Sequence, residues 1–145
     1  MKSIREFVDF NILLNEFSNK VAQENINLPA KLSYAIYRNI NKLASTTKYY
    51  EEERIAIVKK YSKLDKNGEP VIKDNAPVMK DMDKANEEYK NLLELDADVD
   101  LHTINVDVED FTKDLEGNHQ TLTMLWAIID VLDANKPIVK ELASV

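Results

Sequence analysis

Between Pro29 and Gly68 the chain runs without a glycine or a proline. Seam residues recur there alternately four and three positions apart, which is the spacing of a heptad repeat on one helix face. The seam residues are Ile36, Ile40, Leu43, Thr47, Tyr50, Arg54, Ile57, Tyr61 and Leu64, with Thr47 and Arg54 as polar interruptions. The pattern predicts one helix over 30–63, roughly 50 Å long, which is longer than a compact domain of this mass is wide. Part of such a helix has to protrude or pack against a partner helix.

A tongue and a returning helix are predicted to follow the long helix. Asn67-Gly68 is a strong turn signal, and Pro70 and Pro77 confine the short extended pieces of 69–80 to sheet edges. Helical spacing resumes over 81–95. The residues on the apolar side of this second helix are Met82, Ala85, Tyr89, Leu92 and Leu93. Together these segments predict a long antiparallel helical hairpin with a β-tongue at its tip.

Three further segments are predicted to complete the fold at the base of the hairpin. An amphipathic helix is expected over 3–20, where Ser3 and Glu6 match a capping box. Polar and apolar residues alternate over 97–108, which predicts a strand, and a last apolar helix is expected over 121–134. We therefore expect all 145 residues to form a single, mostly helical α+β domain.

The composition excludes several classes of function. The sequence contains no cysteine, which rules out disulfide bonds, thiolate metal sites and cysteine nucleophiles. Its two isolated glycines build no phosphate-binding loop, so we expect no nucleotide cofactor and no enzymatic activity. The net charge of −7 argues against direct binding of duplex nucleic acid. Signal-peptide and membrane-spanning patterns are absent, so we expect a cytoplasmic protein that does not bind membranes.

The long helix carries the candidate residues for protein binding, because tyrosine and arginine are enriched at interface hot spots. These candidates are Tyr34, Tyr37, Arg38, Lys42, Tyr49, Tyr50 and Arg54. Packing inside the molecule is the alternative for the same residues, since tyrosine also packs readily at the edge of a core. Arg54 on the seam is expected to pair with a carboxylate across the hairpin, such as Glu87, Glu88 or Glu94. If no other part of the chain covers the seam near 36–43, a homodimer is expected.

The acidic segment after the return helix offers a weaker alternative. Asp98, Asp100 and His102 would lie on one face of the predicted strand, where two of them with a second element would suit a hard divalent cation. The residues from Asp96 do not match a calcium loop, because Leu101 and Asp107 occupy the positions of its glycine and glutamate. A solvated strand face explains the same pattern.

Several pieces of the chain together resemble a family of small proteins encoded by phages and prophages of low-GC bacteria. The pieces are LPAKLSYAIYRNINKL at 28–43, YEEER at 50–54, KY at 60–61, DKNGEP at 65–70 and DVDLH at 98–102. The resemblance covers about 28–108 and brings no catalytic motif with it. It implies a phage gene product in the bacterial cytoplasm, where small acidic proteins commonly inhibit host proteins or assist particle assembly.

The leading expectation is a non-enzymatic phage accessory protein that binds a protein partner, which we expect to be encoded by the host. Inhibition of a host defence or nucleic-acid-processing protein is its most specific form. A virion-assembly chaperone or connector component is the first alternative. A metal-dependent enzyme using Asp98, Asp100 and His102 is the second alternative.

Overall fold

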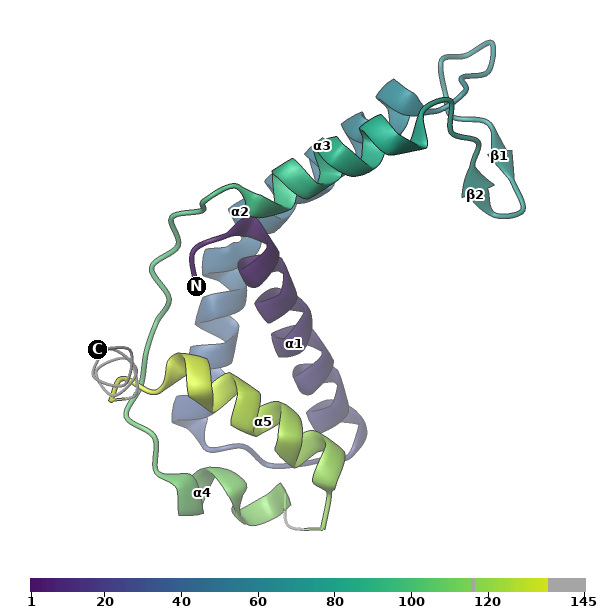
Figure 1. Cartoon of the computed structure of the whole chain (residues 1–145). Coiled ribbons are helices and arrows are strands. Elements are labelled where there is room, and N and C mark those ends of the chain that lie inside the picture. Colours follow the sequence, from purple (N-terminus) through teal and green to yellow (C-terminus); the bar gives the residue numbers. More distant parts are fainter. Residues whose placement is uncertain (116, 136–145) are drawn as a thin grey trace. The chain divides into compact units, whose positions relative to one another are not determined.

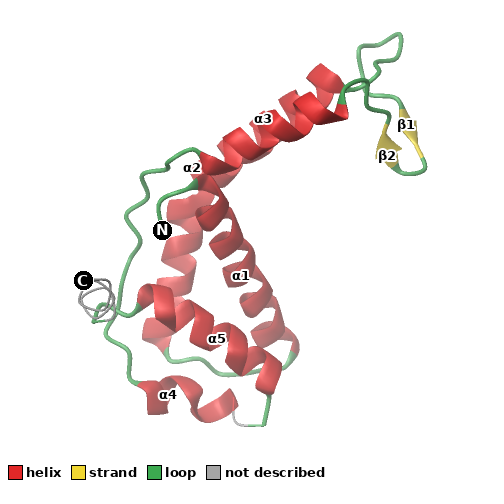
Figure 2. Ribbon diagram, in the orientation of Figure 1, coloured by secondary structure: helices red, strands yellow, loops and turns green. Residues whose placement is uncertain are grey.

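The computed structural model describes residues 1–115 and 117–135, and most of this length is helical (Figure 1; Figure 2). The described elements are the helices α1 (Ile4–Gln23), α2 (Ala30–Tyr61), α3 (Met82–Glu94), α4 (Val108–Thr112) and α5 (His119–Leu132), a 3-10 turn at Lys113–Leu115, and the strands β1 (Ile72–Lys73) and β2 (Ala76–Pro77). The strands β1 and β2 pair antiparallel in a two-stranded sheet. The chain thus has the expected mostly helical α+β fold.

The chain divides into two compact units. The hairpin unit consists of Met1–Val8 and Ser45–Asp98, and the bundle unit consists of Asp9–Ala44 and the described residues from Val99 onward. Both α1 and α2 contribute residues to each unit. That the whole chain is one domain stays a prediction.

Helix α2 is continuous over nearly the whole predicted range. The backbone N–H groups of Leu32 and Ser33 donate to the Pro29 carbonyl at 3.0 and 3.1 Å, as expected where a proline precedes the first turn. Burial along the helix then follows the heptad seam. Ile36, Leu43, Tyr50 and Ile57, at every seventh position, are buried, whereas Ile40, Thr47, Arg54 and Tyr61 between them are half-buried. The polar interruptions therefore fall on the half-buried edge of the seam.

In the hairpin unit, α3 lies along the second part of α2 (Figure 1). Asp81 caps α3 by accepting a hydrogen bond from the backbone N–H of Lys84 at 3.1 Å. The shared core contains Ile4, Val8, Tyr50, Ile57, Ala85, Leu92 and Leu93. The small Ala85 is 6% exposed and belongs to this core. The Ser3–Glu6 capping box forms as predicted, with the Glu6 N–H donating to Ser3 Oγ at 3.3 Å.

The tongue is a small hydrogen-bonded structure rather than a loose loop. Asp74 and Asn75 both have positive φ angles, of 54° and 64°, which is the conformation of the two-residue turn between β1 and β2. The Lys63 N–H donates to the Val78 carbonyl at 2.7 Å, and the Val71 N–H donates to the Lys63 carbonyl at 2.8 Å. The chain that leaves α2 is therefore bonded to both arms of the tongue.

In the bundle unit the described parts of α1, α2, α4 and α5 enclose a second core. Its fully buried members include Leu14, Phe17, Leu32, Leu43, Leu115, Leu125, Ile128, Ile129 and Leu132. Polar contacts join the end of α1 to the start of α5, where Lys20 Nζ donates to Gln120 Oε1 at 2.8 Å. Glu24 accepts hydrogen bonds from Asn118 and from Thr121 Oγ1.

The segment predicted as a strand over 97–108 forms no strand, and α4 begins at Val108. Its regular backbone pairing is limited to isolated bridges, such as the one between Ile104 and Asp133. The Ile104 N–H donates to the Leu132 carbonyl at 2.8 Å, and the Ala134 N–H donates to the Ile104 carbonyl at 2.9 Å. Alternation of polar and apolar residues correctly indicates an extended chain here. No neighbouring strand lies beside it among the described residues, so a ladder does not form.

Candidate binding surface at the hairpin tip

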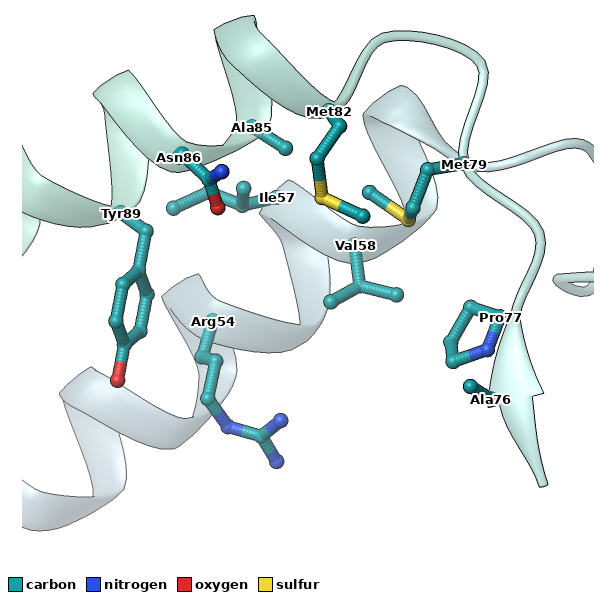
Figure 3. Close-up of a pocket in the computed structure, with 10 residues that line it drawn as sticks. All are labelled: Arg54, Ile57, Val58, Ala76, Pro77, Met79, Met82, Ala85, Asn86 and Tyr89. Carbon is teal, nitrogen blue, oxygen red and sulfur yellow. The ribbon is translucent and has the colours of Figure 1, made fainter.

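A groove of about 380 Å³ opens in the hairpin unit where α2, α3 and the tongue meet (Figure 3). We call it the tip groove. Its lining residues are Arg54, Ile57, Val58, Ala76, Pro77, Met79, Met82, Ala85, Asn86 and Tyr89. Most of these side chains are apolar, and the volume lies in the range that side chains or small ligands occupy in binding pockets.

Helical spacing explains how two sides of the tip groove form. Arg54 and Val58 are four residues apart on α2, and Met82, Asn86 and Tyr89 follow one another at four and three residues on α3. Each set therefore shares one helix face. Figure 3 draws these side chains on the two neighbouring helices.

The tongue supplies the third side of the tip groove. Ala76 and Pro77 of β2 lie at one end, and the side chains of Met79 and Met82 converge near Val58 (Figure 3). The backbone N–H of Lys80 donates to the Tyr61 carbonyl at 2.7 Å, which holds this part of the tongue at the end of α2. The three sides are thus positioned by hydrogen bonds within one compact unit.

The apolar side chains of the tip groove remain accessible. Met82 is 54% exposed, and Val58 and Pro77 are half-buried. Ile55 on the neighbouring face of α2 is also exposed. Methionine adapts its shape easily and is frequent at surfaces that bind varied partners.

Arg54 is the charged side chain among the lining residues, and its partner differs from the predicted one. Its guanidinium bonds Glu51 Oε2 at 2.9 Å on the same helix, three residues earlier, instead of pairing with Glu87, Glu88 or Glu94 across the hairpin. The hydrogen bond to Glu51 raises the pKa of Arg54. The charge itself remains accessible, because the Arg54 side chain is 42% exposed.

Glu88 was one of the predicted partners of Arg54, but it binds other side chains. Its Oε1 accepts hydrogen bonds from Lys60 Nζ at 2.8 Å and from the Tyr61 hydroxyl at 2.6 Å. The two hydrogen bonds, the one from Lys60 first, lower the pKa of Glu88. These contacts join α2 to α3 independently of Arg54.

Tyr34, Arg38 and Lys42, predicted as binding residues, make contacts within the bundle unit. The Tyr34 ring meets the His102 ring edge-on, with 5.7 Å between centroids, and its hydroxyl accepts a hydrogen bond from Arg38 at 2.9 Å. Lys42 Nζ donates to the carbonyl oxygen of Asp100 at 2.7 Å. These side chains hold the extended residues 99–105, which we call the docked segment, on the first part of α2.

The centre of this attachment is Asn39, which the sequence-based site prediction did not include. Its buried amide makes two hydrogen bonds with the backbone of one residue: the His102 N–H donates to Asn39 Oδ1 at 2.7 Å, and Asn39 Nδ2 donates to the His102 carbonyl at 2.9 Å. Asn39 Nδ2 also donates to the Ala35 carbonyl at 2.9 Å. The signal in the sequence is an amide between Ile36 and Leu43 on the apolar side of a helix, where it needs a polar partner.

The remaining predicted binding residues are distributed over different environments. The Tyr50 hydroxyl lies 2.6 Å from the Tyr89 hydroxyl inside the hairpin, and burial together with this hydrogen bond raises the pKa of Tyr50 to about 12. Tyr37 and Tyr49 are exposed, at 65% and 45%. Of the seven predicted residues, the structure places Arg54 in the tip groove.

The acidic segment offers no assembled metal site among the described residues. No three His, Asp or Glu side chains in this part of the chain come together as a potential ligand set. The His102 ring packs edge-on against Tyr34. The use of Asp98, Asp100 and His102 by a metal-dependent enzyme therefore gains no support from the geometry.

Two further findings concern the chain as a whole. In the described residues, every helix is too short or too polar to cross a lipid bilayer. Comparison of the chain with protein-family models, with curated proteins and with solved structures gives no match.

Proposed function

We propose that this chain is a non-enzymatic accessory protein of a phage, which acts in the cytoplasm of the bacterial host by binding a host-encoded protein. The observation that carries the binding role is the tip groove, an accessible apolar surface formed by α2, α3 and the tongue. The phage origin rests on the sequence resemblance over about 28–108. Inhibition of a host defence or nucleic-acid-processing protein is the specific form that this origin favours.

Of the seven predicted binding residues, Arg54 lies in the tip groove, whereas Tyr37 and Tyr49 are exposed outside it and stay predictions. Tyr34, Arg38 and Lys42 are engaged with each other or with the docked segment. Tyr50 is buried against Tyr89. The tip groove exposes apolar side chains such as Met82, which gain contacts when a partner covers them.

The direct test is photo-crosslinking in bacterial cells. We would place p-benzoylphenylalanine at Met82 in one variant and at Ile12 in another, since both side chains are exposed to a similar degree, 54% and 49%. Crosslinked proteins would be identified by mass spectrometry and then purified for binding measurements. We expect a host protein to crosslink from position 82 and not from position 12.

A matched pair of charge substitutions tests whether the groove itself provides the affinity. Met82 is the first residue of α3, where a negative charge is favourable, so Met82→Glu should keep the fold while placing a carboxylate in the groove. We expect this variant to bind the purified partner at least about tenfold more weakly, and Ile12→Glu to bind like the wild type. A partner bound equally well by Met82→Glu, or one crosslinked equally from both positions, would contradict the proposal. A phage structural protein as the partner would favour the assembly alternative instead.

A further inference from the structure

We infer that the tip groove receives an amphipathic helix of the partner, with acidic residues beside its apolar face. This inference rests on the proposed function, because it takes the tip groove as a protein-binding surface and adds the chemistry of what binds there.

The apolar lining of the tip groove favours a partner that inserts apolar side chains. Met79 and Met82 meet above Val58, and Pro77 closes one end (Figure 3). The groove is lined by two helices and the tongue, and one face of an amphipathic helix, whose anchors repeat at i, i+3, i+4 and i+7, would insert apolar side chains between them. An apolar anchor that reached the methionines would cover the exposed part of Met82.

The backbone of the tongue argues against an added strand as the binding mode. The Val78 N–H donates to the Val71 carbonyl at 2.8 Å, and the Val78 carbonyl accepts from the Lys63 N–H at 2.7 Å. Met79 forms a bridge with Ser62, which directly follows the end of α2. The backbone groups of Val78 that a partner strand would need are already used within the hairpin unit, so we expect the partner to bind through its side chains.

Charge complementarity selects an acidic partner. From Arg54 to Tyr89, the span that contains every lining residue, the chain carries eight basic and seven acidic residues, whereas the whole chain has a net charge of −7. Ion pairs engage residues of both signs: Glu69 lies 3.6 Å from Lys59, and Glu88 accepts a hydrogen bond from Lys60. The lining itself contains one cation, Arg54, and no acidic residue.

The positions of two cations relative to the tip groove sharpen this argument. Arg54 belongs to its lining, and Lys73 is the strand partner of the lining residue Ala76. Both side chains are accessible to a partner, because the Arg54 side chain is 42% exposed and Lys73 is exposed. Carboxylates on either side of an apolar helix face would lie near these cations, and a basic helix would be repelled.

The test is a selection from a phage-displayed library of 16-residue peptides with leucine fixed at helical anchor positions and all other positions randomised. The full chain serves as the bait, and the Met82→Glu variant removes peptides that bind elsewhere. We expect aspartate and glutamate to be enriched at least about threefold over the unselected library. Enrichment of neutral or basic residues, or no peptide that depends on Met82, would overturn the inference.

Binding of a selected peptide, made synthetically, then tests the role of charge. We expect Arg54→Gln to weaken binding at least about threefold, and Lys48→Gln, which removes a charge from another face of α2, to leave it unchanged. Circular dichroism checks that both variants fold. Equal effects of the two substitutions, or binding that does not weaken with added salt, would overturn the inference.

The selection separates this inference from the proposed function, because it needs no host protein. Acidic peptides that bind through Arg54, with no host protein crosslinked from position 82, would support the surface chemistry and contradict the function. A host protein that crosslinks at position 82, but whose binding changes neither in Arg54→Gln nor with added salt, would support the function and contradict the surface chemistry. If the wild-type chain has the molar mass of a dimer and the Met82→Glu variant has that of a monomer, a second copy of the chain occupies the groove. That result would overturn the inference.

Discussion

Replacement of Asn39 with alanine removes the amide that holds the backbone of His102 on α2. The substitution leaves the His102 N–H and carbonyl without the partners that now lie at 2.7 and 2.9 Å. An unsatisfied buried polar group costs about 1–3 kcal/mol, and the two groups here are partly buried, so we take about 2–3 kcal/mol together. The higher helix propensity of alanine raises the unfolding free energy by roughly 0.5 kcal/mol. The expected net loss is about 2 kcal/mol of unfolding free energy.

Asn41 provides the matched control, because it is an exposed asparagine two residues further along the same helix. Asn41→Ala gains the same helix propensity and removes no buried contact. We would measure urea unfolding of both variants by circular dichroism, and hydrogen exchange at the His102 amide. Asn39→Ala should be about 2 kcal/mol less stable than Asn41→Ala and should exchange faster at His102. A difference below about 0.5 kcal/mol, with unchanged exchange, would refute the assigned role of Asn39.

Two further predictions concern the two cores. The unfolding free energy should fall as pH rises from about 10 to about 12, because Tyr50 keeps its proton in the folded state and loses it in the unfolded state. Tyr50→Phe should remove up to about 2–3 kcal/mol of this fall. If the variant has the same pH dependence as the wild type, the buried pair with Tyr89 is contradicted. Leu125→Ala, at a fully buried site, should lower the free energy of unfolding in denaturant by about 2–5 kcal/mol. Leu64→Ala, at a site that is 43% exposed, should lower it by less than about 1 kcal/mol. Similar losses in the two variants would contradict the described core.

The helices could be predicted because their signals are local. The seam of α2 repeats every seven residues, and the buried positions Ile36, Leu43, Tyr50 and Ile57 follow that period. Caps such as Ser3 and the turn near Gly68 act within a few residues. Such features require no knowledge of what lies elsewhere in the chain.

The strand prediction over 97–108 was wrong because alternation describes only one chain, whereas a strand needs a neighbour. The backbone of His102 is bonded instead to a side chain, that of Asn39 on α2. Lys42, which stays a predicted binding residue, also donates a hydrogen bond to the Asp100 carbonyl, a contact that the sequence did not indicate. Sequence periodicity does not reveal which helix face a distant extended segment covers.

The tip groove could be predicted only in part. Arg54 was recognised from its residue type and its place on the seam, but its partner was predicted on the opposite helix instead of at Glu51. The groove itself joins Val58, Met79 and Met82, which come from three segments with no common spacing. Their convergence depends on how the tongue folds back on the end of α2, a tertiary arrangement that no local pattern encodes.

Hydrogen–deuterium exchange tests most directly whether the tip groove is the binding surface. It would be measured on the chain alone and on the chain saturated with the purified host protein that crosslinking had identified. If the groove is the binding surface, exchange should slow at 54–58 and 76–89 and should stay unchanged in α5. Slower exchange in α5 with no change at 54–58 and 76–89 would place the partner on the bundle unit and contradict the proposed function.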